Sequence, residues 1–254
     1  MKGVFVILDG VSDQKCSTLG YKTPLEVAKT ENLDFFAKKS KLDYCYTVKK
    51  DYVPESNEGV LSLFGYDSFA VGRGALEALG LGINLKGGDL AFRCNFASIE
   101  SINEGNVLDR RAGRTLTTKE ARILARAINE GVKLPFKFQF YPSIQHRGVL
   151  VINGGFSDNI SNVEAKDGKL AFSKVLDEED DSQLSADLVN QFVRKSFDVL
   201  DRHSVNVARA RKGLFSANSI LCRGAESDKI RLKKLKGKWM ALGYMPLEKG
   251  IAKA

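Results

Sequence analysis

The sequence has few of the residues that hold small or metal-bound folds together: 254 residues contain four cysteines and two histidines. The cysteines, at positions 16, 45, 94 and 222, are isolated from one another, and no Cys-x-x-Cys pair occurs. This spacing argues against a zinc ribbon, an iron–sulfur site and a disulfide scaffold. Since no apolar leader is expected before the first cysteine, the pattern predicts a cytoplasmic protein in a reducing compartment.

Long apolar runs are also scarce. Asp, Arg or Gly interrupts each run within about eight positions, whereas a membrane span needs about 18 to 20 apolar residues. We therefore expect no membrane partner. Because 43% of the residues are hydrophobic, the chain is not a disordered tail, and one large domain or two smaller ones can bury a core.

The charge is basic but uneven, with 39 Lys and Arg against 31 Asp and Glu. An acidic run occupies 177–181, and six basic residues fall within 229–238. A nucleic-acid-binding protein is one interpretation, and it predicts affinity that falls steeply with salt. The basic cluster lacks the interleaved aromatic residues that stack on bases, so we favour exposed loop or helix surfaces for both runs.

The apolar spacing predicts alternating strands and helices. Residues 2–9 form a continuous apolar run ending in Asp9 and Gly10, which is typical of a buried strand in an α/β sheet covered on both faces. Capping boxes begin two helices, one at Thr23 and one at Thr117. Helices are predicted from Thr23 and over 32–40, 56–64, 75–79, 117–129 and 185–200, and further strands over 42–48, 90–98, 136–141, 147–152, 214–221 and 238–244.

Two residues suggest chemistry when they are taken together. Asp9 follows the first predicted strand, where α/β sheets place their ligands, and Ser56 begins a predicted helix. Taken singly, they are interpreted as a turn aspartate and an N-cap serine. Together they could share one divalent cation, which would lower the pKa of the serine and make it a nucleophile toward phosphorus.

A series of ordered motifs then resembles one family, the archaeal-type cofactor-independent phosphoglycerate mutases of the alkaline-phosphatase superfamily. The motifs are the 2–10 segment, Lys22-Thr-Pro-Leu-Glu26, Asn32-Leu-Asp34, Val53-Pro-Glu-Ser56, 61–67, 72–80, Asp109-Arg-Arg-Ala-Gly-Arg114, His146-Arg147, His203-Ser-Val-Asn206 and Arg223-Gly-Ala225.

The resemblance implies an α/β fold: an incomplete alkaline-phosphatase-like sheet with a smaller α/β substrate domain inserted in it. The expected boundaries are 1–72 and 238–254 for the phosphatase-like part and 73–237 for the insertion. It also implies an isomerase of glycolysis and gluconeogenesis. Such an enzyme interconverts 3-phosphoglycerate and 2-phosphoglycerate through a phosphoserine, without bisphosphoglycerate.

Site residues follow from the same resemblance. Ser56 matches the serine that takes the phosphoryl group, and Asp9 and Ser56 match ligands of one of two divalent metal ions, Mn²⁺ or Mg²⁺. The residues expected around the substrate are Asp109, Arg110, Arg111, Arg114, His146, Arg147 and Arg223. Arginines suit this role because phosphoglycerate carries a carboxylate and a phosphate, and both pair with a forked guanidinium.

The sequence also departs from the family pattern. Family members continue further and supply the remaining metal ligands there, so we expect this chain to need a second polypeptide with the C-terminal half of the phosphatase domain. An incomplete or non-catalytic subunit is the alternative. Residues 162–168 replace a short acidic motif that ends in Asp-Pro, and Glu226 replaces a glycine.

Overall fold

The computed structural model describes residues 3–176, 180–227, 230 and 232–254. The chain divides into an N-terminal unit, Met1–Gly65, and a C-terminal unit, Tyr66–Ala254. No helix in the described part of the chain is both long and apolar enough to cross a bilayer.

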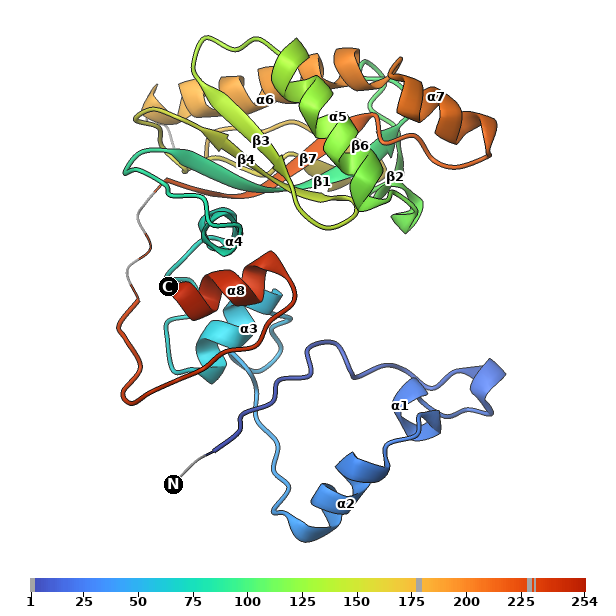
Figure 1. Ribbon diagram of the computed structural model, residues 1–254, viewed down its shortest axis with the longest axis vertical. Helices are drawn as coiled ribbons and strands as arrows, with labels where there is room; N and C mark the ends of the chain where they lie inside the picture. The colour runs from blue at the N-terminus through green and yellow to red at the C-terminus, as the bar shows by residue number, and fades with distance from the viewer. Residues whose placement is uncertain (1–2, 177–179, 228–229, 231) are drawn as a thin grey trace. The chain divides into compact units, whose positions relative to one another are not determined.

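Short helices joined by extended chain make up the N-terminal unit (Figure 1). They are the 3₁₀ turn η1 (Ser17–Leu19), α1 (Pro24–Val27), α2 (Glu31–Lys39) and α3 (Ser56–Leu63). The predicted capping box is confirmed: the Glu26 N–H donates to Thr23 Oγ1 at 3.2 Å, and the Thr23 N–H donates to Glu26 Oε2 at 2.7 Å.

The two strands predicted in this unit are wrong. Residues 3–8 and 41–46 are irregular, and Val4 is 92% exposed. A buried strand needs a neighbouring strand to pair its backbone and an apolar layer to cover it. The described residues of this unit contain no β-strand, so an apolar sequence alone does not make one here.

The C-terminal unit combines an antiparallel sheet with helices. Its helices are α4 (Arg73–Gly80), α5 (Thr118–Gly131), α6 (Asp180–Leu200), α7 (Ser204–Arg211), α8 (Pro246–Lys253) and the 3₁₀ turn η2 (Ala112–Arg114). Its strands are β1 (Leu90–Ile99), β2 (Val107–Asp109), β3 (Phe138–Pro142), β4 (Arg147–Ile152), β5 (Glu164–Lys166), β6 (Lys169–Ala171) and β7 (Ser219–Glu226).

Strand β1 is the centre of the five-stranded sheet. It pairs with β4 on one side, and β3 follows β4; β7 and β2 pair with successive parts of β1. Every pairing is antiparallel, and β5 and β6 form a separate hairpin. All ten residues of β1 are buried, so the strand has no face open to solvent along its length.

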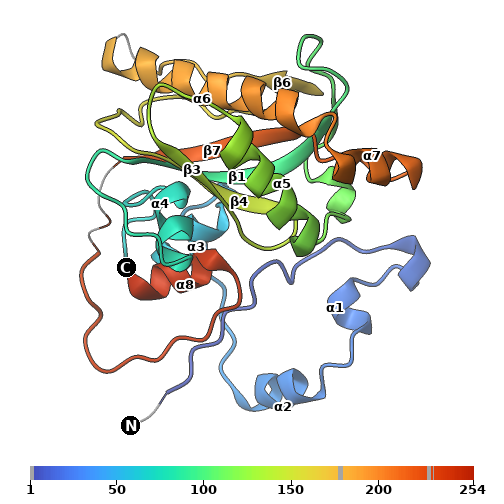
Figure 2. The same cartoon turned by 45° about the horizontal axis from the view of Figure 1, so that its top comes forward.

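Helices cover the two faces of the sheet differently (Figure 2). α5 and α6 pack on one face around Phe96, Phe140 and Phe192, which belong to the main apolar core. α4 packs on the other face, where Ala78 contacts a smaller cluster with Val149 and Val151. The first face therefore carries the main apolar core, and the second carries a smaller apolar cluster beside α4.

The sequence-based expectations for this unit are mostly confirmed. Helices α4, α5 and α6 and strands β1, β3 and β4 lie where the periodicity placed them. The strand expected over 214–221 is shifted to β7, the strand expected over 238–244 is irregular, and α7 and α8 were not predicted. The acidic run over 177–181 falls mostly outside the described residues, and the boundaries 1–72, 73–237 and 238–254 stay a prediction.

Candidate active site

In the N-terminal unit, the Ser56 hydroxyl donates a hydrogen bond to Asp9 Oδ2 at 3.0 Å. The two residues are far apart in the sequence, and Asp9 is exposed while Ser56 is half-buried. A ring contact keeps the two segments together, since the Phe5 and Phe64 centroids are 5.5 Å apart, edge to face. The structure therefore brings together the hydroxyl and the carboxylate that the sequence analysis selected.

Ser56 is the first residue of α3, and a capping arrangement fixes that helix end. Glu58 Oε2 accepts hydrogen bonds from the Glu55 N–H and the Tyr52 hydroxyl, both at 2.8 Å. The first turn of a helix carries free N–H groups and the positive end of the helix dipole. Ser56 is thus held where a negatively charged oxygen or a phosphate is stabilised.

The family resemblance implies divalent metal ions at this pair. Asp9 and Ser56 offer one carboxylate and one hydroxyl oxygen, the hard ligands that Mg²⁺ and Mn²⁺ take, but such an ion takes about six ligands. The described residues contain no group of three or more His, Cys, Asp or Glu side chains that could hold a metal. By themselves, Asp9 and Ser56 therefore supply only part of a metal site.

In the C-terminal unit, arginines from three strands converge on one face of the sheet. Arg93 on β1 pairs in register with Arg223 on β7, and Asn95 on β1 pairs with Arg147 on β4. Residues directly opposite in an antiparallel pair point to the same face, as do residues two apart on one strand. Arg93, Asn95, Arg147 and Arg223 therefore form what we call the arginine face.

Two carboxylates contact the arginine face. Glu77 on α4 is buried, and its Oε1 lies 3.4 Å from Arg93 Nε. Glu164 Oε2 lies 3.7 Å from Arg223 Nη1. Arg147 Nη1 contacts the Met245 sulfur at 3.4 Å, and its buried Nε has no hydrogen-bond partner among the described residues.

The arginine loop, residues 109–114, adds three further guanidinium groups. Asp109 Oδ1 accepts hydrogen bonds from the N–H groups of Arg111 and Gly113, both at 2.7 Å, so this carboxylate shapes the loop. Ala112, Gly113 and Arg114 all have positive φ, near 49°, 64° and 55°. Two of them are not glycine, and such a backbone persists only where its surroundings hold it.

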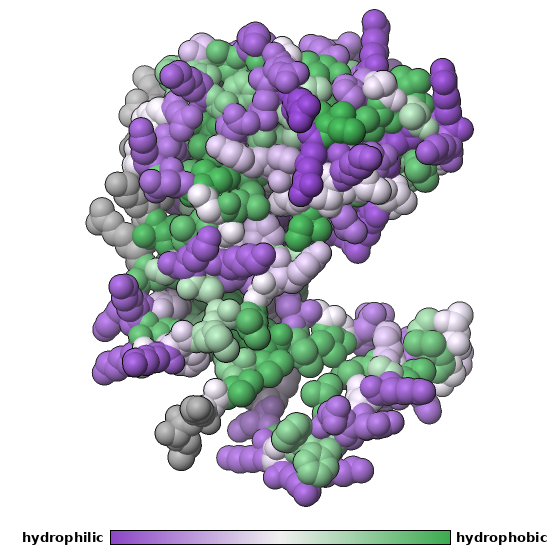
Figure 3. All heavy atoms as spheres, in the orientation of Figure 1, coloured by the Kyte–Doolittle hydropathy of each residue, from purple (hydrophilic) through white to green (hydrophobic). Residues whose placement is uncertain are grey.

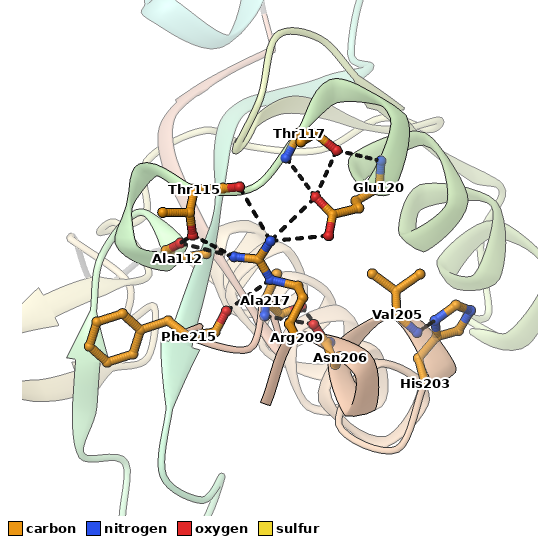
Figure 4. Close-up of polar contacts among 10 residues, drawn as sticks. All are labelled: Ala112, Thr115, Thr117, Glu120, His203, Val205, Asn206, Arg209, Phe215 and Ala217. Atoms are coloured by element: carbon orange, nitrogen blue, oxygen red, sulfur yellow. Dashed lines mark hydrogen bonds and ion pairs between the residues drawn. The ribbon is translucent and has the colours of Figure 1, made fainter. Parts of the chain in front are cut away.

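Arg209 on α7 holds this loop (Figure 4). Its guanidinium donates to the Ala112 carbonyl at 3.4 Å, to Thr115 Oγ1 at 2.8 Å and to Glu120 Oε1 at 3.2 Å. Its Nε donates to the Phe215 carbonyl at 2.9 Å. Since Arg209 is only 1% exposed, its guanidinium is shielded from water, and these bonds hold the left-handed turn.

Burial and the arginines near His146 lower the pKa of its imidazole. Burial and the charges of Arg147, Arg111, Arg114 and Arg93, in that order, lower the pKa of His146 from 6.5 to about 4. The imidazole is therefore neutral at pH 7. Its buried Nδ1 has no hydrogen-bond partner among the described residues.

The pKa of Arg111 is affected by burial and by its neighbouring arginines in the same way. Desolvation, followed by the charges of Arg114, Arg110, Arg147 and Arg223, lowers the pKa of Arg111 from its ordinary value. The arginine loop and the arginine face therefore act on one another as like charges. Such an excess of one sign is stabilised when an anion binds among the groups.

Two parts of the chain depart from the family pattern, residues 162–168 and Glu226. Both make contacts at or near the Arg223-Gly-Ala225 motif. Asn162 Oδ1 accepts a hydrogen bond from the Gly224 N–H at 2.9 Å. Glu226 accepts one from the Gly72 N–H, next to the first residue of α4. These side chains therefore fix the strand and the loop that border the arginine face.

Sequence reasoning missed Arg93, Asn95 and Arg209. The available signal was the pattern Arg-Cys-Asn inside the apolar strand β1, because charged and amide side chains are seldom buried without a partner. No local signal identifies Arg209. His203, which belongs to a family-like motif, is the N-cap of α7: its Nδ1 accepts from the Val205 N–H at 3.2 Å.

A hydroxyl–carboxylate pair and an arginine-rich surface are suited to phosphorylated ligands, and the known proteins similar to this chain are named as phosphoglycerate mutases. The family profile described as 2,3-bisphosphoglycerate-independent phosphoglycerate mutase matches residues 37–206. A relative of that name from Thermococcus gammatolerans is 40% identical over the whole chain, and one from Methanopyrus kandleri is 41% identical over 88% of it. This chain belongs to that family.

A solved structure supports the fold. The cofactor-independent phosphoglycerate mutase from Thermoplasma acidophilum is 32% identical, matches 86% of this chain and gives a TM-score of 0.54. The chain spans 62% of the Thermococcus relative's length and 57% of that of the Thermoplasma structure. The predicted family, its partial coverage and the incomplete α/β fold are therefore confirmed.

Proposed function

We propose that this chain carries the nucleophile and the substrate-binding residues of a phosphoglycerate mutase that interconverts 3-phosphoglycerate and 2-phosphoglycerate. The observation that carries the proposal is the accumulation of arginines around a neutral, buried His146 in a member of this family. Guanidinium groups pair with carboxylate and phosphate oxygens through forked hydrogen bonds, and phosphoglycerate carries both anions.

Asp109, Arg110, Arg111, Arg114, His146, Arg147 and Arg223 are the proposed substrate-binding residues. The arginines hold the two anionic ends of the glycerate, while Asp109 keeps the arginine loop in shape through the Arg111 and Gly113 N–H groups. Neutral His146 adds no further positive charge, so it can lie close to the arginines without repelling them.

The proposed reaction is phosphoryl transfer through Ser56. Ser56 Oγ forms a bond to phosphorus as the bond from phosphorus to the glycerate oxygen breaks, and the serine proton ends on that glycerate oxygen. The glycerate turns within the arginines, and the reverse step places the phosphoryl group on the neighbouring hydroxyl. Asp9, which accepts the hydrogen bond of Ser56, orients the hydroxyl.

Two divalent metal ions, Mn²⁺ or Mg²⁺, complete this proposal, with Asp9 and Ser56 as ligands of one of them. Bound metal would supply positive charge to the phosphoryl oxygens. The other ligands are proposed to come from a second polypeptide that corresponds to the part of the relatives this chain does not span. No bisphosphoglycerate takes part, in keeping with the names of the relatives.

The surface of the N-terminal unit supports such a partner. Apolar side chains lie open among charged ones there (Figure 3), and they include Phe5, Val6 and Leu8, each more than half exposed. Exposed apolar segments of this kind are usually covered by another chain or another segment. We propose that the partner supplies the strands that pair with residues 3–8.

A cytoplasmic location also belongs to this proposal. The two buried cysteines, Cys94 and Cys222, have sulfurs 3.6 Å apart on neighbouring strands and are not bonded to each other. Reduced thiols this close are typical of proteins kept in a reducing compartment.

A reconstitution assay tests the proposal. The purified chain is mixed with a polypeptide that spans the part of the Thermococcus relative beyond the 62% that this chain covers. Turnover is followed by coupling 2-phosphoglycerate to enolase in Mn²⁺ buffer. We expect activity from the mixture, none from either chain alone, and none with Ser56→Ala. Ser62→Ala in the same helix is the matched control. Equal turnover by the Ser56→Ala mixture would contradict the role of Ser56.

A further inference from the structure

Asn95 is an unexplained polar residue at the centre of the sheet. It lies on β1, is 7% exposed, and its side-chain oxygen Oδ1 has no hydrogen-bond partner among the described residues. A buried amide oxygen without a partner destabilises a folded protein, because it has lost its hydrogen bonds to water. An apolar residue would fill this strand position without that cost, so the amide suggests a ligand.

The strand register shows what Asn95 faces. Cys94 and Phe96, on either side of it, belong to the apolar core beneath α5 and α6. Asn95 therefore points to the opposite face, the one shared with Arg93, where Arg147 is its directly paired neighbour on β4. Arg223 is opposite Arg93 and diagonal to Asn95, so three guanidinium-bearing positions surround the amide.

Arginine and asparagine differ in what they can do for a ligand. A guanidinium group has five N–H donors and no acceptor, so it binds anionic oxygens but cannot accept a hydrogen bond from a hydroxyl group. The Asn95 oxygen is an acceptor. A ligand that carries both anions and a hydroxyl would satisfy the arginines and Asn95 together.

We propose that Asn95 is a specificity-determining residue that accepts a hydrogen bond from the free hydroxyl of a phosphorylated hydroxy acid bound by the arginine face. The inference rests on the proposed function and extends it, because it assigns the recognition of the uncharged part of the substrate to a residue outside the motifs. In this role, Asn95 distinguishes phosphorylated hydroxy acids from analogues that carry the same charge and lack the hydroxyl.

The test compares two ligands on the isolated chain by titration calorimetry. One is 3-phosphoglycerate, and the other is 3-phosphooxypropionate, which has the same two anions and lacks the hydroxyl. Wild-type protein is expected to bind 3-phosphoglycerate about tenfold more tightly, the value of one hydrogen bond. Asn95→Leu, which keeps the side-chain size, is expected to lose this preference and to retain its affinity for 3-phosphooxypropionate.

Controls separate a structural role from recognition. Asn153→Leu, at an exposed asparagine after β4, is expected to keep the preference. Asn95→Ala carries the same prediction and replaces the leucine variant if that variant does not fold. Equal weakening of both ligands in a folded Asn95 variant would make the residue structural and overturn the inference.

The wild-type result alone also distinguishes the two proposals. Equal affinity for both ligands would overturn the role of Asn95 and leave the anion site of the proposed function intact. Binding of neither ligand would contradict the proposed function itself.

Discussion

Protonation of His146 is expected to destabilise the C-terminal unit as the pH falls. Burial and the surrounding arginines lower the pKa of the folded-state imidazole to about 4, while the ordinary value is 6.5. Between these values the unfolded chain binds a proton that the folded chain does not. The stability associated with neutral His146 is therefore complete above pH 6.5 and is lost as the pH falls toward 4.

The size of this effect follows from the two pKa values. A tenfold difference in proton affinity corresponds to about 1.4 kcal/mol, so a pKa lowered from 6.5 to about 4 limits the loss to about 3 kcal/mol. That is a large part of the 5 to 15 kcal/mol typical of a folded domain. Other titrating groups add their own pH dependence, which a matched variant removes.

Urea unfolding at pH 7.5, 6.5, 5.5 and 4.5 measures the effect, with His146→Gln as the variant that cannot titrate. We expect wild-type stability to fall by about 2 to 3 kcal/mol more than that of the variant over this range. Saturating phosphate is expected to reduce the difference, because an anion among the arginines stabilises protonated His146. Identical slopes for the two proteins would show that His146 has the same pKa in the folded and the unfolded chain, which contradicts the expectation.

Three further predictions concern the loop, its support and the packing of α8. Alanine at Arg110, Arg111 or Arg114 is expected to weaken 3-phosphoglycerate binding at least tenfold in calorimetry. The same change is expected to alter the free energy of unfolding in urea by about 0.5 kcal/mol, since these side chains are exposed. A large loss of stability with unchanged affinity would show that the loop is only structural. Arg209→Met is expected to cost about 3 to 5 kcal/mol in urea unfolding, because it removes a buried, fully hydrogen-bonded cation, and a loss under 1 kcal/mol would contradict its role. Gly250→Ala is expected to lower the melting temperature, since a Cβ there would lie 1.9 Å from a carbonyl oxygen of α4; unchanged melting would show that α8 does not pack as described.

Local signals in the sequence predicted most helices well. The capping boxes at Thr23 and Thr117 act over four residues, so the sequence contains all that is needed to place those helix starts. α8 begins with Pro246 after Met245, a favourable first-turn position that was overlooked. α7 was missed because its N-cap is His203, which seldom has that role.

Non-local features could not be predicted in this way. The apolar segment 3–8 has the sequence of a buried strand, yet a strand forms only where neighbouring strands are present. The arginine face depends on the register of β4 and β7 against β1, which brings Arg147 and Arg223 beside Asn95 and Arg93. Single-sequence patterns do not contain that register, so Asn95 became visible only in the structure.

Mass spectrometry of the reconstituted mixture can detect the phosphoserine on which the proposed function depends. The chain and the partner polypeptide are incubated with 3-phosphoglycerate and Mn²⁺, quenched in acid and digested, and the peptide that contains Ser56 is analysed. We expect phosphate on Ser56 during turnover and no phosphate on Ser56 without substrate. Turnover with Ser56 unmodified at every time point, and with phosphate on another residue, would contradict it.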